Sequence, residues 1–124
     1  MRHGLKRNNL NRAKDQQLAL MRSLTRELIK NGHIETTLSK AKVLRSFIEK
    51  IITKAKKSNS AAEPSEKLHY IRLVRKHIAA DVLDTLLERA KPLKDRNGGY
   101  TRILKTSKRA GDATQMSIIQ ILDN

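Results

Sequence analysis

The chain has no cysteine and no tryptophan, and Phe47, Tyr70 and Tyr100 are its only aromatic residues. The lack of cysteine excludes disulfide bonds and thiolate metal sites. Three scattered rings are too few for the stacking platform on which proteins bind single-stranded bases. There is also no apolar run close to the roughly 18–20 residues of a membrane span. We therefore expect no membrane partner.

Acidic residues are also scarce. The 124 residues include 27 Lys and Arg but only 12 Asp and Glu, which gives a formal net charge of +15. A net charge this far from zero destabilises the compact state by self-repulsion. Nucleic acid is the natural compensating partner, because it carries about one negative charge per 1.7 Å of duplex axis and releases counterions when Lys and Arg bind. The charge balance therefore indicates a nucleic-acid partner.

Three segments hold much of the positive charge. Residues 1–14 have no acid and almost no apolar periodicity, so we predict a basic, extended N-terminal arm that becomes ordered on its partner. Residues 40–57 contain Glu49 as their only acid, and residues 100–111 contain none. In chain order, the basic residues of the three segments are Arg2, Lys6, Arg7, Arg12, Lys14, Lys40, Lys42, Arg45, Lys50, Lys54, Lys56, Lys57, Arg102, Lys105, Lys108 and Arg109.

The remaining residues, 15–124, fit a single α+β domain. Apolar periodicity predicts four helices, the first with Asp15 as its N-cap and Asn31-Gly32 as its left-handed end. Leu68, Ile71, Val74 and Ile78 mark the third helix, and residues 58–65 form the only linker-like stretch before it. The other three helices are predicted at about residues 15–31, 39–57 and 80–90.

After residue 99 the apolar period changes to two. Residues 100–105 and 116–122 are therefore predicted to form a C-terminal β-hairpin. The short β-prone segment 33–37 is able to join this hairpin as a third strand. The predicted class is thus α+β, with helices first and a small sheet last.

Catalytic constellations are nearly absent. The histidines at positions 3, 33, 69 and 77 lack the spacing of a helical zinc site, and no Gly-rich phosphate loop is present. Asp81 and Asp84, three apart, are expected in the first turn of a helix, where negative charge is favourable. We expect no catalytic residue, metal, cofactor or small-molecule substrate. An RNA-cleaving or RNA-modifying enzyme that uses His69 or His77 is the alternative.

The motifs that the sequence lacks also indicate which kind of nucleic acid the protein binds. Zinc-finger, basic-zipper and RNA-recognition-motif signatures are missing. Residues 66–90 could form a helix-turn-helix, but Asp81, Asp84 and Glu88 would place acid on its second helix. Recognition of folded RNA by shape and phosphate remains as the favoured mode. A DNA-binding or nucleoid-associated protein that uses residues 66–90 is the alternative.

Five short motifs carry a resemblance to a known family. They are MRH at 1–3, LNR at 10–12, IETTLSKAKVLR at 34–45, GGYTRILK at 98–105 and RAGDA at 109–113, followed by Met116. Their order and spacing closely resemble protein seventeen of the bacterial large ribosomal subunit, from residue 1 to about residue 122. Residues 56–80 contribute little to the resemblance. The chain departs from the family pattern at Gly4, at Gln16-Gln17 and at Gln120.

The resemblance implies an α+β domain packed on large-subunit ribosomal RNA, with its arm extended into the RNA. It also implies a position toward the rim of the peptide exit tunnel, beside other ribosomal proteins, and no catalytic activity or cofactor. We expect the protein in the ribosome of a bacterial cytoplasm, with an organelle as the other possible source. We do not expect it to form a homo-oligomer.

The resemblance and the charge pattern together give a set of residues expected to face rRNA. By motif position these are Arg2, His3, Arg12, Lys40, Lys42, Arg45, Tyr100, Arg102 and Arg109. Charge alone adds Lys6, Arg7, Lys14, Lys105 and Lys108.

Overall fold

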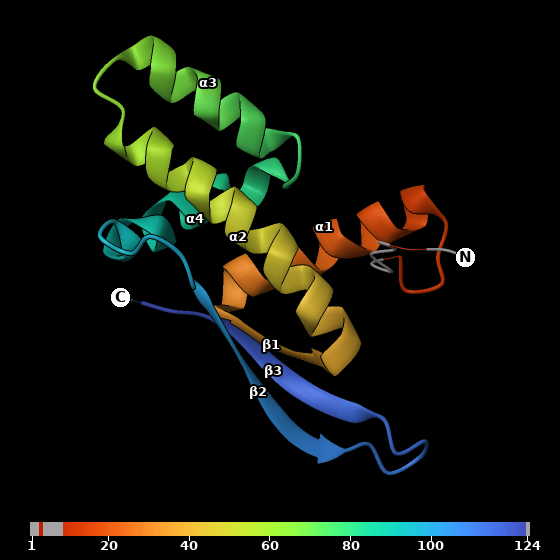
Figure 1. The fold of residues 1–124 in the computed structure, drawn as a ribbon. Coiled ribbons are helices and arrows are strands. Elements are labelled where there is room, and N and C mark those ends of the chain that lie inside the picture. The colour runs from red at the N-terminus through yellow and green to blue at the C-terminus, as the bar shows by residue number, and fades with distance from the viewer. Residues whose placement is uncertain (1–2, 4–8, 124) are drawn as a thin grey trace.

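The computed structural model describes His3 and residues 9–123, which form an α+β domain (Figure 1). The predicted class and the predicted number of helices are confirmed. Arg2, Lys6 and Arg7 lie outside the described residues. In chain order the elements are α1 (Lys14–Asn31), β1 (His33–Thr37), α2 (Leu38–Ser60), α3 (Pro64–Arg75), a 3-10 turn (Ala80–Val82), α4 (Leu83–Ala90), a second 3-10 turn (Lys91–Leu93), β2 (Thr101–Lys108) and β3 (Gln115–Ile121).

The three strands form one antiparallel sheet in the order β1-β3-β2. The C-terminal hairpin and its third strand at residues 33–37 are therefore confirmed. Ile119 pairs with Ile34 on one side and Ile103 on the other, and this face packs against the helices. The opposite face carries the exposed Leu104, and none of the described helices lies over it (Figure 1).

The core is organised around α2. Its buried residues recur every three or four positions, so one stripe of the helix faces the other elements. Ser58 continues this stripe and is fully buried, and α2 therefore runs to Ser60 rather than to the predicted end at residue 57. The buried α2 residues are Ala41, Leu44, Ile48, Ile51, Ile52, Ala55 and Ser58.

The ends of α1 differ in how well the sequence predicted them. Asp15 was predicted as the N-cap, which is wrong: the cap position is Ala13 and Asp15 lies in the first turn, where its charge favours the positive end of the helix. Lys14, assigned to the arm, is the first helical residue. The predicted C-terminal end is confirmed, because Gly32 has a φ of 82° and donates its N–H to the Leu28 carbonyl at 2.8 Å.

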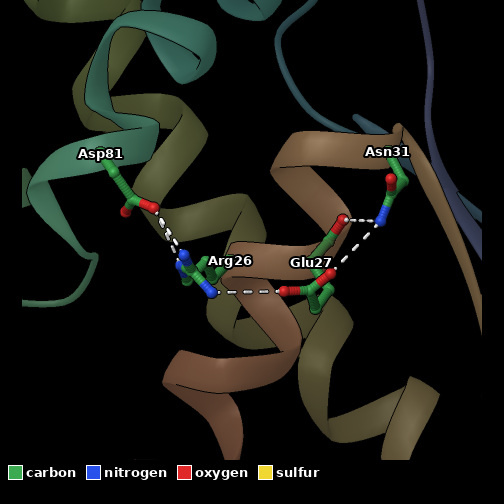
Figure 2. Close-up of polar contacts among 4 residues, drawn as sticks. All are labelled: Arg26, Glu27, Asn31 and Asp81. Atoms are coloured by element: carbon green, nitrogen blue, oxygen red, sulfur yellow. Dashed lines mark hydrogen bonds and ion pairs between the residues drawn. The ribbon is translucent and has the colours of Figure 1, made fainter.

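The helices α3 and α4 are shorter than predicted. Ile78 is buried but lies beyond the end of α3, and Leu68, expected on the apolar face, is 46% exposed. A 3-10 turn precedes α4 and holds Asp81 in its first turn. There Asp81 accepts hydrogen bonds from Arg26 of α1, so an ion pair joins the start of the α4 region to the first helix (Figure 2).

Candidate nucleic-acid interface

Strand register places two basic segments at the same end of the sheet. Thr37, the last residue of β1, pairs with Met116, and Lys108, the last residue of β2, pairs with Gln115. Because α2 begins directly after Thr37, its first turns start at the end of the sheet that also carries the 109–114 loop. Figure 1 shows both on the side of the molecule where α1 begins.

The first turns of α2 combine an uncapped helix end with several cations and no acid in the first turn. Thr37 makes no side-chain capping hydrogen bond, and the first turn contains no acid. Lys42 and Arg45 are exposed and Lys40 is half-buried. A helix N-terminus carries partial positive charge and unpaired N–H groups, so cations are unfavourable there unless an anion is present. The same arrangement is a ready phosphate site.

Lys105 and Lys108 extend this basic surface along β2. Both are exposed, and Lys105 lies opposite Ser117 on the face of the sheet that the helices cover. Within the described part of the chain, five of the predicted residues at this end have no hydrogen bond or ion pair through their side chains. We call these five the sheet-end cluster: Lys40, Lys42, Arg45, Lys105 and Lys108.

Arg109 differs from the cluster because it already has a partner. Its Nε and Nη2 donate to the two carboxylate oxygens of Asp112, at 3.1 and 2.6 Å. One of those oxygens also accepts the Thr114 N–H at 3.2 Å, and the Arg109 N–H donates to the Thr114 carbonyl at 2.8 Å. The hydrogen bond from Arg109 holds the pKa of Asp112 well below its usual range. Arg109 therefore shapes the hairpin loop.

Two of the residues predicted to face rRNA, Tyr100 and Arg102, lie away from the sheet-end cluster. Tyr100 is only 3% exposed, and its hydroxyl accepts a hydrogen bond from Lys56 Nζ at 3.0 Å. It is a core residue with little surface to offer, so we correct its assignment as RNA-facing and leave it out of the interface. Arg102 is exposed but pairs with Gln120 on the open face, about 20 Å along β2 from Lys108. It does not join the sheet-end cluster.

The described part of the predicted arm lies near the start of α1. Arg12 and Lys14 are exposed, as is His3. Leu10 packs against the core, so the segment just before α1 is attached to the domain. These residues add positive charge on the side where α2 begins.

Several basic residues outside the set predicted to face rRNA make hydrogen bonds within the fold. Arg89 donates to the carbonyls of Ile29 and Lys30, at 2.6 and 3.2 Å. It thus supplies hydrogen bonds to two carbonyl groups at the C-terminal end of α1. Arg22 donates to the Lys76 carbonyl at 2.8 Å. Sequence alone offered no signal for these roles, because each donor and its acceptor are more than 50 residues apart.

No catalytic arrangement emerges from the histidines. His77 lies edge-on to Phe47, with the ring centroids 5.8 Å apart, and His69 packs on Tyr70. Burial lowers the pKa of His77, and the nearby charge of Lys54 lowers it further. Over residue 3 and residues 9–123, no group of three or more His, Cys, Asp or Glu is placed to hold a metal ion. None of the described helices is long and apolar enough to cross a membrane.

Comparison with known proteins gives the same family from a sequence model and from individual relatives. The sequence model of the family described as ribosomal protein L17 matches residues 20–122. Three of the most similar relatives are called large ribosomal subunit protein bL17. The relative from Persephonella marina is 46% identical, covering 100% of this chain and 97% of its own length. Those from Gemmatimonas aurantiaca and Kosmotoga olearia are 44% and 41% identical, covering 98% and 99% of this chain and 98% and 94% of their own lengths.

Proposed function

The chain belongs to the ribosomal protein L17 family, whose members are structural and non-enzymatic, and we propose that it is a constituent of the large ribosomal subunit that binds large-subunit rRNA. Near-full-length similarity to proteins named for that subunit supports this assignment. The formal charge of +15 supports an RNA partner. The proposal extends to neighbouring large-subunit proteins as partners, to a position near the rim of the peptide exit tunnel and to a monomeric chain outside the ribosome.

The single observation that carries the proposal is the sheet-end cluster. Five cations whose side chains have no hydrogen bond or ion pair with another described residue lie toward one end of the sheet, and three of them belong to the first turns of α2. Self-repulsion and the positive helix end both disfavour this arrangement in the isolated protein. RNA phosphates would remove both penalties, because they supply negative charge to the ammonium and guanidinium groups and accept from the free N–H groups of α2.

The N-terminal segment belongs to the same proposed interface. Arg12 and Lys14 are exposed near the start of α1, and Arg2, Lys6 and Arg7 precede them in the sequence. We propose that this segment contacts the RNA beside the sheet-end cluster. Arg102 then contacts RNA separately, from the open face of the sheet.

Nothing in the fold favours DNA binding through residues 66–90. The second helix of such a motif would be α4, which has eight residues and exposes Asp84 and Glu88. Carboxylates on that surface would repel the phosphates that a recognition helix must approach. The fold therefore does not support this alternative.

The proposal is tested by salt-washing assembled particles. In the variant Lys42→Gln/Arg45→Gln the protein should leave large subunits at lower salt than wild type in sucrose gradients. A matched variant, Lys30→Gln/Lys50→Gln, also removes two positive charges, but both lie outside the sheet-end cluster. This variant should dissociate from large subunits at nearly the same salt concentration as wild type. Circular dichroism checks that both variants fold. Wild-type protein that never sediments with large subunits would refute the proposed function.

A further inference from the structure

The C-terminal end of α2 carries a second concentration of lysines. Four of them come from three separate parts of the chain and surround a pocket of about 550 Å³. We call it the lysine pocket, and none of the described Asp or Glu residues lines it. Its lining residues are Lys56, Asn59, Ser60, Lys67, Ala90, Lys91 and Lys94.

Intramolecular charges offset only part of this positive charge. Glu88 pairs with Lys91, with 2.8 Å between Oε1 and Nζ. The helices α2 and α4 both end at the pocket, at Ser60 and Ala90, and each helix end carries about half a negative charge. The carboxylate and the two helix ends offset only part of the four lysine charges, and Lys67 lies in the first turn of α3, where the helix end is positive. A net positive charge therefore remains at the pocket.

The pocket is held in shape by contacts with the core. Lys56 donates to the Arg96 carbonyl and to the Tyr100 hydroxyl, and its Nζ lies 4.7 Å from the centre of the buried Tyr100 ring. Asn59 Nδ2 donates to the Leu87 carbonyl at 3.0 Å, which joins the end of α2 to α4. One ammonium group is therefore fixed at the pocket before any ligand arrives.

Lys67 and Lys94 are the two remaining cations at the pocket. Both are exposed, and neither makes a side-chain hydrogen bond or ion pair with another described residue. An ammonium group is a compact point charge that donates to a phosphate oxygen in many orientations. The pocket thus offers one fixed donor and two adjustable donors, and none of its lining residues has an aromatic ring on which a base could stack.

We propose that the lysine pocket is a second rRNA-binding site, which takes backbone phosphates of an RNA segment separate from the one at the sheet-end cluster. Lys42 and Asn59 are separated by about 25 Å of α2, so the two sites lie at opposite ends of one rigid helix. A single chain then fixes the distance between two stretches of RNA. This inference rests on the proposed rRNA-binding function.

The absence of cysteine allows a direct test in the full-length protein. Ser60→Cys places a unique thiol at the lysine pocket, and Ser46→Cys places one beside Arg45. Each thiol is coupled to Fe(II)-EDTA, the protein is assembled with large-subunit rRNA, and hydroxyl-radical cleavage of the RNA is mapped. We expect both probes to cleave and the cleaved nucleotides to differ between them.

The outcomes separate the two proposals. Cleavage from position 46 without cleavage from position 60 overturns the lysine pocket as an RNA site and leaves the proposed function intact. That result is also expected if the pocket binds an acidic protein segment. Absence of cleavage from both positions, with both proteins folded, contradicts the proposed function itself.

A charge variant tests whether the lysines are responsible. Lys67→Gln/Lys94→Gln, made in the Ser60→Cys protein, should abolish cleavage from position 60. In the Ser46→Cys protein it should leave cleavage from position 46 unchanged. It should also reduce the slope of log affinity against log salt by about two, one for each phosphate that a lysine no longer neutralises. The control Lys30→Gln/Lys50→Gln should preserve cleavage from position 60. Unchanged cleavage and an unchanged slope in the Lys67→Gln/Lys94→Gln protein would overturn the assignment.

Discussion

The guanidinium of Arg26 donates through both Nε and Nη2 to one carboxylate oxygen of Asp81, at 3.1 and 2.7 Å (Figure 2). Arg26 lies in the C-terminal half of α1, and Asp81 lies in the 3-10 turn before α4. The same guanidinium contacts Glu27 at 3.5 Å, and Glu27 in turn accepts from Asn31. This connected set fixes the start of the α4 region on α1.

The Arg26–Asp81 pair predicts an acid-dependent loss of stability. The hydrogen bond from Arg26 lowers the folded-state pKa of Asp81 below its usual value. The ion pair therefore makes its full contribution to the free energy of unfolding above the pKa of Asp81 in the unfolded chain, near pH 4. This contribution is lost as the pH falls through the lower pKa of Asp81 in the folded protein. Asp81→Asn should lower the Tm slightly at pH 7 and make the decrease of Tm below pH 4 less steep.

Asp95→Asn is the matched control for Asp81→Asn. Asp95 is exposed and has no ion pair within the described chain, so its replacement should leave the acid limb of the Tm profile unchanged. Because Arg26 and Asp81 are both nearly half-exposed, added salt should reduce the difference between wild type and Asp81→Asn. Identical acid limbs for wild type and Asp81→Asn would contradict the assigned role of the pair.

Gly32 predicts a second stability effect. Its φ of 82° lies in the left-handed region, and an added Cβ would lie 3.1 Å from Arg89 Nη1. Gly32→Ala should lower the free energy of unfolding by about 1–2 kcal/mol through backbone strain, and more if Arg89 loses its bonds to the end of α1. Denaturant unfolding measures the change. Gly111→Ala, where nothing lies within 4 Å of the new Cβ, should be close to neutral.

Local signals explain which parts of the fold were predictable. The end of α1 follows from Asn31-Gly32, and β1 follows from a short β-prone run directly after that turn. The end of α2 was missed because Ser58, Asn59 and Ser60 have the composition of a linker. Packing decides that boundary: Ser58 is fully buried, and α3 lies along α2 in Figure 1.

The sequence predicts only those parts of the candidate interface that lie in runs of basic residues. Lys40, Lys42 and Arg45 form a contiguous basic segment, and their position at one end of the sheet follows from the register of β1 with β3. The lysine pocket was not predictable, since its members come from α2, α3 and the segment after α4. Tyr100 was misassigned because a family motif gives a residue's position in the sequence and not its burial.

Tyr100 predicts a separation between stability and RNA binding. Tyr100→Phe removes the hydroxyl that accepts from Lys56 but keeps the buried ring. The free energy of unfolding should fall by about 0.5–1.5 kcal/mol, the typical net contribution of one hydrogen bond. The affinity for rRNA should stay near the wild-type value, whereas Arg102→Gln should weaken rRNA binding without changing stability. A larger loss of rRNA affinity in Tyr100→Phe than in Arg102→Gln would show that Tyr100 contacts RNA after all.

The most direct measurement is the affinity of the purified full-length protein for large-subunit rRNA as a function of salt. If phosphate neutralisation by about 6–10 Lys and Arg side chains drives binding, the affinity should fall about 10³–10⁵-fold between roughly 50 and 200 mM salt. Lys42→Gln/Arg45→Gln should reduce the slope of log affinity against log salt by about two. An affinity that stays constant over this range, or a slope that the variant leaves unchanged, would contradict the account.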